Sequence, residues 1–124
     1  FDVDRFKAYN DTRGHLEGDE ALKKIAKVLG GSTRKMNLTA RWGGEEFLSM
    51  LSDTPVEGGR IFAERVLSEI HQTFPDGSLT LSAGVARFTE KMDTPTRLLS
   101  AADQAMYEAK AAGGDCVRVA GETT

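Results

Sequence analysis

The sequence predicts a single α/β domain in which helices flank a mixed, largely antiparallel β-sheet, an α/β sandwich. Short apolar runs typical of strands alternate with longer segments whose apolar residues recur at helical spacing. Two of the apolar runs flank a Gly-Gly turn, which indicates an antiparallel hairpin. The chain has 124 residues, 40% of them hydrophobic, which is enough for one core, so we expect residues 1–124 to form one domain.

The first part of the chain is expected to hold the end of a strand and two helices. The opening residues 1–4 have the pattern of a strand whose earlier residues are missing. A short helix follows to about Arg13, with Asp4 or a neighbour as its N-cap. A loop over residues 14–18 leads into a helix that Asp19 caps and that stops at residues 30–31, a glycine pair. Its apolar positions follow helical spacing: Leu22, Ile25, Ala26 and Leu29.

The rest of the chain is expected to alternate strands and helices. A polar connection over residues 32–37 leads into the hairpin strands, 38–42 and 47–51. Pro55 opens a helix, and residues 79–88 form the next strand. Pro95 opens a last long helix, which ends at a glycine pair and is followed by a strand over residues 116–119. The apolar faces are Ala63, Val66, Leu67, Ile70 and Phe74 in the first helix, and Leu98, Ala102, Ala105, Met106 and Ala109 in the second.

Composition and charge exclude several classes of protein. The single cysteine, Cys116, rules out a disulfide framework and a cysteine-based zinc cluster, and it fits a reducing cytoplasm. A net charge of -3 argues against sequence-independent binding of nucleic acid or anionic lipid, because both require a basic face. No apolar run approaches the roughly twenty residues of a membrane span, and no signal peptide opens the sequence. We therefore expect a cytoplasmic domain with no nucleic-acid partner and no direct membrane contact.

The turn of the hairpin breaks a local sequence rule. Gly43 and Gly44 are expected to form a two-residue primed turn, because only glycine takes positive φ angles without strain. Glu45 and Glu46 then stand where a β-branched or aromatic residue would begin the strand more favourably. Since successive strand side chains point to opposite faces, the two carboxylates are expected to do different jobs. The alternative is that both are solvated charges at a hairpin tip.

Asp2 and Glu45 are candidate ligands of a divalent metal ion. Asp2 ends an apolar strand, where a buried carboxylate is costly unless it is paired or bound to a cation. If that strand neighbours the hairpin, Asp2 and Glu45 together present hard oxygen ligands. Mg²⁺ prefers such a set, with one or two carboxylates, a backbone carbonyl and the phosphate oxygens of a substrate.

Other polar residues fit either a nucleotide site or ordinary surface roles. Lys7 and Lys110 are candidate phosphate partners, although lysines on helix surfaces are more often solvated. Asn10 and Asp19 flank the predicted glycine loop and have the acceptors and donors to read a base edge, but both residue types are also common caps and turn residues. Four further residues are interpreted as structural or core: His15, His71, Trp42 and Phe47.

Five segments of the sequence together resemble the GGDEF family of diguanylate cyclases. They occur in order, at the family's spacings, and cover essentially the whole chain: Phe1-Asp2-Val3-Asp4-Arg5-Phe6-Lys7, Asn10-Asp11 with Gly14-His15 and Gly18-Asp19, Arg41-Trp42-Gly43-Gly44-Glu45-Glu46-Phe47, Ser82-Ala83-Gly84-Val85, and residues 102–110. The resemblance implies a nucleotidyl-cyclase fold like the palm of polymerases. It also implies condensation of two GTP molecules into cyclic di-GMP, with release of pyrophosphate.

The resemblance implies a role for each matched residue. Asp2, the Val3 carbonyl and Glu45 are the implied ligands of Mg²⁺ or Mn²⁺, and Glu45 is also the implied base for the ribose 3′-hydroxyl. Glu46 is implied to support the metal site. The implied GTP contacts are the backbone at Phe6, Gly43 and Gly44, the side chains of Lys7 and Lys110 for the triphosphate, and Asn10 with Asp19 for guanine. A carboxylate at Asp19 can accept from both N1–H and the exocyclic amine of guanine, so we expect no mixed product.

Two sites depart from the family's pattern. The Arg-x-x-Asp of the family's product-inhibition site here keeps Arg34 but has Asn37 in place of the acid, which puts tight feedback by cyclic di-GMP in doubt. Arg65 matches a second arginine of that site. After Lys110, the usual Gly-Arg-Asn reads Gly-Gly-Asp, so Gly114 replaces a phosphate-contacting arginine and weaker GTP binding is expected.

The resemblance also implies partners. Each family domain holds one GTP, and two domains must face each other for reaction, so catalysis is expected to need a homodimer. An upstream sensor or receiver domain usually brings the dimer together, so this chain alone is predicted to be monomeric or weakly associated. The family's amino-terminal helix and the start of the first strand are missing, which predicts lower stability or activity. Two alternatives are an idle GGDEF module that binds GTP or mediates contacts between signalling domains, and a polymerase-like nucleotidyl transferase, which the acidic surface disfavours.

Overall fold

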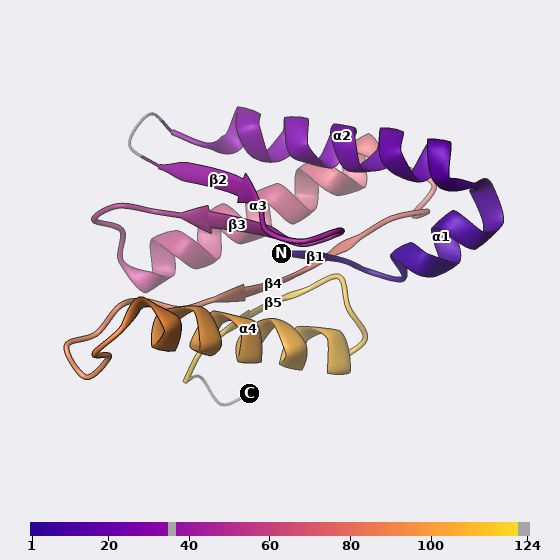
Figure 1. Ribbon diagram of the computed structural model, residues 1–124. Helices are drawn as coiled ribbons and strands as arrows, with labels where there is room; N and C mark the ends of the chain where they lie inside the picture. The colour runs from indigo at the N-terminus through magenta and orange to yellow at the C-terminus, as the bar shows by residue number, and fades with distance from the viewer. Residues whose placement is uncertain (35–36, 122–124) are drawn as a thin grey trace.

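The computed structural model describes residues 1–34 and 37–121 and confirms the predicted α/β class (Figure 1). Helices and strands follow one another in the predicted order. They are β1 (Asp2–Val3), α1 (Phe6–Arg13), α2 (His15–Ser32), β2 (Leu38–Arg41), β3 (Phe47–Met50), α3 (Val56–Thr73), β4 (Leu81–Val85), α4 (Pro95–Ala111) and β5 (Val117–Val119). No helix in these two ranges combines the length and the hydrophobicity needed to cross a bilayer.

The strands form two small sheets that adjoin through β1. β1 pairs antiparallel with β4, and β4 pairs in parallel with β5 after the crossover through α4. β2 and β3 pair antiparallel as the predicted hairpin. An antiparallel bridge between Asp2 and Glu46, and a hydrogen bond of 3.1 Å from Val3 N to Glu45 O, fasten the hairpin to β1. The acidic turn, residues 43–46, therefore lies beside β1.

Alternate residues of β4 serve the two faces of its sheet. Leu81 and Ala83 are buried in the core that α2 and α3 help to build. Ser82 and Gly84 point to the opposite face, where Ser82 bonds to Asp4 and Gly84 packs against α4. A Cβ at Gly84 would overlap the backbone of α4 at Ala102, so only glycine lets the helix pack this closely on the strand.

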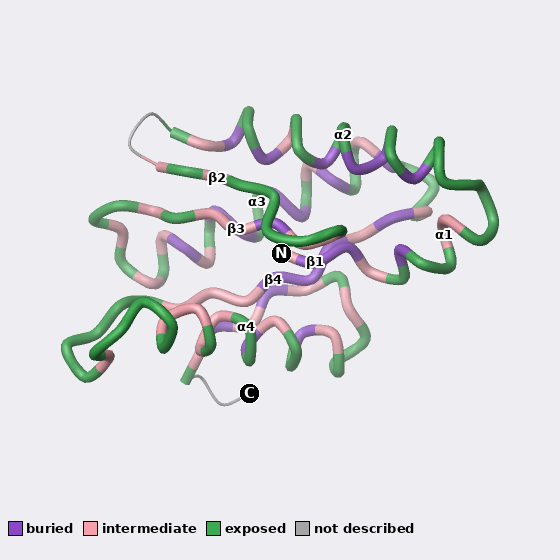
Figure 2. Tube along the Cα trace, viewed as in Figure 1, coloured by how far each residue is buried: buried purple, intermediate pink, exposed green. Residues whose placement is uncertain are grey.

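The core lies between the strands and helices α2 and α3, largely as predicted (Figure 2). All five apolar positions predicted for α3 and its end are buried, as are three of the four predicted for α2. Ala26 is exposed and Ala21 is buried, because the buried side of α2 follows positions 18, 21, 22, 25, 29 and 32. The helical residues of the core include Leu22, Ile25, Leu29, Phe62, Ala63, Val66, Leu67 and Ile70.

Two helix starts differ from the prediction. α1 follows Arg5, which has a left-handed backbone (φ 52°), and no side chain caps it, because the Asp4 carboxylate bonds elsewhere. α2 begins at His15, directly after Gly14 (φ 87°). The predicted loop over residues 14–18 is therefore mostly the first turn of α2, and Asp19 lies inside the helix and does not cap it.

The hairpin turn is wider than predicted. Trp42 N donates to Glu46 O at 2.8 Å, so the turn encloses residues 43–45 and not the glycine pair alone. Neither glycine has a positive φ, so the predicted primed turn is wrong. Trp42 is 61% exposed, against the prediction, because it continues the outward face of β2, on which Leu38 is also 61% exposed. Phe47 is 4% exposed and is core, as predicted.

Candidate active site

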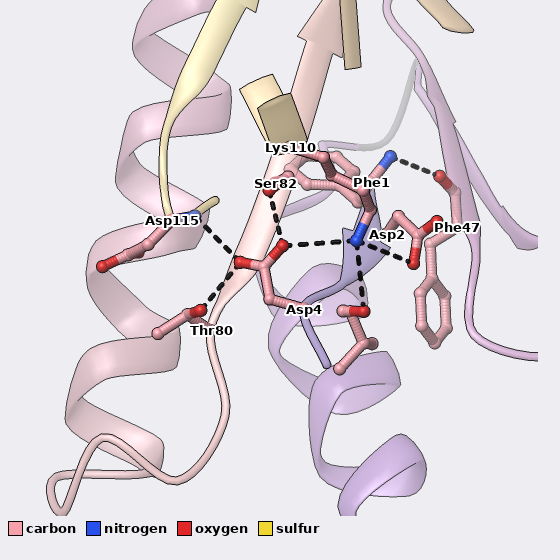
Figure 3. Close-up of polar contacts among 9 residues, drawn as sticks. Phe1, Asp2, Asp4, Phe47, Thr80, Ser82, Lys110 and Asp115 are labelled. Atoms are coloured by element: carbon pink, nitrogen blue, oxygen red, sulfur yellow. Dashed lines mark hydrogen bonds and ion pairs between the residues drawn. The ribbon is translucent and has the colours of Figure 1, made fainter. Parts of the chain in front are cut away.

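The Asp4 carboxylate, just past the end of β1, is held by donors from other parts of the chain (Figure 3). It accepts hydrogen bonds from Thr80 Oγ1 (2.7 Å), Ser82 Oγ (2.6 Å) and the backbone N–H of Asp115 (2.8 Å). Asp4 thereby ties β1 to β4 and to the loop that follows α4. Sequence reasoning gave Asp4 only a possible capping role and missed this network. The available signal was its spacing of two residues from Asp2, which suits two carboxylates on one side of a strand.

Lys110, in the last turn of α4, brings a positive charge to the same place. Its Nζ lies 3.4 Å from Asp2 Oδ1 and 3.3 Å from Asp4 Oδ1, and it donates to the Val3 carbonyl at 3.4 Å. Figure 3 shows the ammonium between the two carboxylates. We call Asp2, Val3, Asp4 and Lys110 the carboxylate corner. The structure brings Lys110 to two of the predicted metal ligands.

The pKa values of Asp2 and Asp4 are shifted in opposite directions. Burial raises the pKa of the Asp4 carboxyl, but hydrogen bonds from Ser82, Thr80 and a backbone amide outweigh it, so that the pKa lies below its usual value. Burial raises the pKa of the Asp2 carboxyl above its usual value, and Lys110 offsets this only in part. Asp2 Oδ1 accepts no hydrogen bond, because Lys110 meets it at ion-pair distance without hydrogen-bond geometry.

Glu45 reaches the carboxylate corner from the hairpin. Its backbone carbonyl accepts from Val3 N at 3.1 Å, so the acidic turn and β1 are neighbours, as the metal-site prediction required. The pKa of the Glu45 carboxyl is raised, first by partial burial and then by the negative charge of Asp2, with Lys110 opposing the shift. A carboxylate whose charge is disfavoured in this way is suited to binding a cation or accepting a proton.

The acidic turn is held in shape by Arg41, at the end of β2. Arg41 Nε donates to the carbonyls of Gly43 and Gly44, both at 3.1 Å, and Nη2 donates to Gly44 O at 2.6 Å. The Glu46 side chain folds back beside Gly43. Arg41 belongs to the sequence motif, but no role was predicted for it. Its several donors, placed directly before a glycine turn with free carbonyls, were the available signal.

The carboxylate corner and Glu45 fit a hard divalent cation. Asp2 and Glu45 supply carboxylates, Val3 supplies a backbone carbonyl, and one Asp2 oxygen has no hydrogen-bond partner. Mg²⁺ is typically held by one or two carboxylates, with its other positions taken by water and substrate phosphate. No three His, Cys, Asp or Glu side chains gather into a metal cluster within the described ranges. The donor set therefore fits an ion shared with a phosphate substrate and not a closed structural site.

The predicted base-reading residues lie where α1 packs on α2. Asn10, on α1, is half-buried, and its Oδ1 is buried without a hydrogen-bond partner. A Cβ at Gly18 would overlap that oxygen, so the glycine provides the space for the Asn10 side chain. Asp19 follows Gly18 on α2 and is exposed. The two helices thus present an amide and a carboxylate from one junction.

Phe6 and Lys7 form the first turn of α1, soon after β1. Amides of a helix's first turn have no acceptor within the helix and attract anions. The Phe6 side chain is in the core, so its backbone is the part available to a ligand. The Lys7 side chain is exposed, whereas that of Lys110 is 31% exposed and paired with two carboxylates.

The loop after α4 turns back onto Asp4. Gly113 (φ 114°), Gly114 (φ 78°) and Asp115 (φ 51°) are all left-handed, which brings the Asp115 amide to the Asp4 carboxylate. A Cβ at Gly114 would come within 2.9 Å of that carboxylate. The departure at Gly114 therefore suits the close packing of this loop. His71 Nε2 lies 2.7 Å from the Asp115 carboxylate, which fits the structural role expected for His71.

The residues that match a product-inhibition site come from the connection between α2 and β2 and from α3. Arg34 is exposed just after α2, and residues 35–36 of that register lie outside the described residues. Asn37 Oδ1 accepts from Ser52 N at 3.1 Å, so the side chain links the two ends of the hairpin. The Arg65 guanidinium lies 5.8 Å from the centre of a phenylalanine ring on α3.

Comparison with known families matches residues 1–116 to the diguanylate cyclase GGDEF domain. Diguanylate cyclase DgcP of Pseudomonas aeruginosa is 42% identical over 124 residues, which cover 96% of this chain and 18% of that protein. The response regulator PleD of Caulobacter vibrioides is 38% identical over 123 residues, which cover 94% of this chain and 27% of that protein. Diguanylate cyclase A of Treponema denticola is 36% identical over 117 residues, which cover 90% and 32%. The chain thus spans less than a third of the length of these relatives.

Solved structures show the same fold. The active GGEEF domain of a diguanylate cyclase from Vibrio cholerae has a TM-score of 0.90 and 30% identity, and the match covers 98% of this chain and 80% of that one. The GGDEF domain of DgcB from Caulobacter crescentus, solved in complex with c-di-GMP, has a TM-score of 0.91 and 28% identity, with coverage of 98% and 75%.

Proposed function

Because the chain belongs to the GGDEF family of diguanylate cyclase domains, we propose that it condenses two GTP molecules into cyclic di-GMP. The ribose 3′-oxygen of each GTP forms a bond to the α-phosphorus of the other, the bond from that phosphorus to the β-phosphate breaks, and two pyrophosphates leave. The observation that supports this most strongly is the junction of β1 with the acidic turn. There Asp2, Val3 and Glu45 lie as neighbours on adjacent segments.

Asp2, the Val3 carbonyl and Glu45 would hold Mg²⁺ or Mn²⁺. When bound, such an ion supplies charge stabilisation at the α-phosphate and lowers the pKa of the attacking hydroxyl. Glu45 would accept the 3′-hydroxyl proton, and its raised pKa suits a base. Glu46, which bridges to Asp2 through the backbone, would support the position of the turn.

The triphosphate would be bound by two lysines and by backbone amides. Lys7 and Lys110 would neutralise phosphate charge and hold the leaving pyrophosphate, with the amides near Phe6 at the start of α1. Gly43 and Gly44 are exposed and carry no side chain between the backbone and a ligand, which lets the nucleotide approach.

Guanine would be read by Asn10 and Asp19. With Asn10 Oδ1 turned inward, its Nδ2 is the group available to donate to guanine O6 or N7. The Asp19 carboxylate would accept from guanine N1–H and the exocyclic amine. Adenine lacks that pair of donors, so we propose cyclic di-GMP as the product and no mixed dinucleotide.

Residues 1–124 would act as one catalytic domain within a homodimer, because one chain holds one GTP. A sensor or receiver domain upstream would bring two chains together. PleD is named a response regulator, and diguanylate cyclase SiaD of Pseudomonas aeruginosa was solved with its activator SiaC, which supports control by partners in this family. We propose a cytoplasmic location, where GTP is available.

Feedback by cyclic di-GMP would be weak in this chain. Asn37 carries no charge for the product's guanine donors, and its oxygen already accepts from Ser52 N. Arg34 and Arg65 would remain as a partial site. Isothermal titration with cyclic di-GMP should therefore show weaker binding to the wild type than to the Asn37→Asp variant.

An idle GGDEF module is the second candidate, and Gly114 is the observation that favours it. Glycine there has a positive φ and packs against Asp4, in place of a phosphate-contacting arginine. Such a module would bind GTP or mediate contacts between signalling domains without turnover.

Product analysis separates the two functions. Micromolar protein, fused to a dimerising segment, would be incubated with GTP and Mg²⁺ and analysed by mass spectrometry, with Glu45→Ala and Glu46→Ala as controls. Cyclic di-GMP from the wild type, with little or none from Glu45→Ala, is the expected result. GTP binding without any product from the dimerised wild type would establish the idle module instead.

A further inference from the structure

We propose that Lys110 is an internal counter-cation of the metal site: it occupies the carboxylate corner when no divalent ion is bound and leaves Asp2 and Val3 when one binds. The inference rests on the proposed function, because it takes Asp2, Val3 and Glu45 as the metal ligands. It gives Lys110 two alternative positions, one on the carboxylates and one directed at the triphosphate.

The contacts of Lys110 overlap with those of the expected metal ion. Its Nζ lies 3.4 Å from Asp2 Oδ1 and 3.4 Å from the Val3 carbonyl, which are two of the three proposed ligand groups. Both groups present hard oxygens, and two cations cannot share the same oxygens at such distances without strong repulsion. A divalent ion at Asp2 and Val3 therefore displaces the ammonium.

Asp4 explains why the displacement leaves the corner intact. The third contact of Lys110, at 3.3 Å, is to Asp4 Oδ1. This oxygen also accepts from Ser82 Oγ at 2.6 Å. The other Asp4 oxygen accepts from Thr80 Oγ1 and from the Asp115 amide. Asp4 therefore keeps three donors after Lys110 departs, so no buried acceptor is left unpaired.

Charge balance favours the same exchange. Asp2 and Asp4 are nearly buried and lie close together, and Glu45 adds a third carboxylate from the turn. Without a cation, such a group of charges would be strongly destabilising. Lys110 is one-third exposed and sits at the end of a helix, so its flexible stem can turn toward solvent and a bound triphosphate.

Metal binding without nucleotide tests the proposal. Mn²⁺ would be titrated into the wild type, Lys110→Met, Lys110→Arg and, as a matched control, Lys27→Met on the exposed face of α2, with free Mn²⁺ measured by electron paramagnetic resonance. Lys110→Met should bind Mn²⁺ about tenfold more tightly than the wild type, equivalent to about 1.4 kcal/mol. Lys27→Met and the charge-conserving Lys110→Arg should not gain affinity.

The same variants should respond to nucleotide in the opposite direction. A non-hydrolysable GTP analogue with Mn²⁺ should bind Lys110→Met more weakly than the wild type, since the phosphate contact is lost. If the role of Lys110 were purely structural, Lys110→Met would bind both Mn²⁺ and the nucleotide more weakly than the wild type. Mn²⁺ affinity of Lys110→Met equal to or below that of the wild type would overturn the proposal.

Two further measurements separate failure of this proposal from failure of the proposed site. If Asp2→Asn binds Mn²⁺ as tightly as the wild type, the metal binds elsewhere. Both the proposed metal site and the proposed role of Lys110 are then wrong. If Lys110→Met does not fold, the wild type decides the question by NMR of ¹³C-labelled lysine side chains. Added Mg²⁺ without nucleotide should shift the Lys110 ε-carbon signal and leave that of Lys27 in place, and an unchanged Lys110 signal would overturn the proposal.

Discussion

The two halves of the candidate site, the carboxylate corner and the acidic turn, are built in opposite ways. In the corner, Asp4 accepts from two hydroxyls and a backbone amide, and its pKa is lowered. In the turn, Gly43 and Gly44 are exposed, and the pKa of Glu45 is raised. The difference separates two kinds of acid. A carboxylate whose oxygens all accept hydrogen bonds stabilises the fold. A carboxylate whose charge is not compensated is available to bind a ligand.

Asp2 lies in the carboxylate corner, but its pKa is raised like that of Glu45 in the acidic turn. It is 8% exposed, its Oδ1 accepts no hydrogen bond, and its pKa is raised. Asp2 and Asp4 are therefore the sharpest pair for testing the comparison, since they lie two residues apart and differ in their hydrogen bonds.

Removal of the Asp4 carboxylate should have the largest effect on stability. Asp4→Ala leaves Thr80, Ser82 and a backbone amide without their acceptor, and it leaves Lys110 with only the Asp2 carboxylate and the Val3 carbonyl. We expect a loss of about 3–5 kcal/mol in the free energy of unfolding, the range for breaking a buried ion pair. Urea denaturation followed by circular dichroism measures it, with Asp4→Asn as the milder control. A loss below about 1 kcal/mol would mean that the network is not structural.

Lowering the pH should gradually remove the stability that the Asp4 carboxylate provides. Because the pKa of Asp4 lies below its unfolded value of 3.8, the unfolded chain takes up the proton first as the pH falls. The stability that ionised Asp4 provides is thus fully present above that value and is lost as the pH falls through the folded pKa. The difference in unfolding free energy between the wild type and Asp4→Asn should shrink across this acid range. A difference that does not change with pH would contradict the network's dependence on charge.

Asp2→Asn should act in the opposite direction. The raised pKa of Asp2 means that its charge opposes folding above the folded pKa, and that this penalty disappears as the pH falls through that value. In the presence of a chelator at neutral pH, Asp2→Asn should therefore stabilise the protein by about 0.5–2 kcal/mol, while the proposed cyclase activity should be lost. Thermal unfolding with EDTA measures the gain, and a destabilised Asp2→Asn would show that Asp2 belongs with Asp4 as a structural acid.

Trp42→Ala should have the smallest effect. Trp42 is 61% exposed on the outward face of the hairpin, so its removal should change the unfolding free energy by at most about 0.5 kcal/mol. The matched control is Phe47→Ala across the same turn, which should cost about 3–5 kcal/mol because Phe47 is buried. Comparable losses for both variants would mean that the turn is covered and not exposed.

The sequence predicted the elements that depend on periodicity, and it failed where tertiary contacts decide. The faces of α2 and α3 followed from helical spacing, and the position of the hairpin followed from its glycines. Trp42 was wrongly assigned to the core. An aromatic residue in a two-stranded hairpin does not indicate which face of the hairpin is buried. Asp19 was wrongly assigned as a cap, because a single left-handed Gly14 was enough to join α1 to α2.

The candidate site shows the same limit. Asp2, Val3 and Glu45 were predicted to be neighbours, and the hydrogen bond from Val3 N to Glu45 O places their segments side by side. Lys110 was predicted only as a phosphate contact, and its ion pair with Asp2 was missed. The bonds of Asp4 were missed because its partners, Ser82 and the amide of Asp115, lie 78 and 111 residues away in the chain. No local pattern could connect groups that are so distant in sequence.

The position of the metal ion is the most direct test of the proposed site. Crystals of the protein grown with a non-hydrolysable GTP analogue and Mn²⁺ would be examined by anomalous scattering, which locates manganese without reference to the rest of the structure. We expect a manganese peak bound by Asp2, the Val3 carbonyl and Glu45, with Lys110 moved toward the phosphates. A fully occupied nucleotide with no manganese at Asp2, or with Lys110 still on Asp2 and Val3, would contradict it.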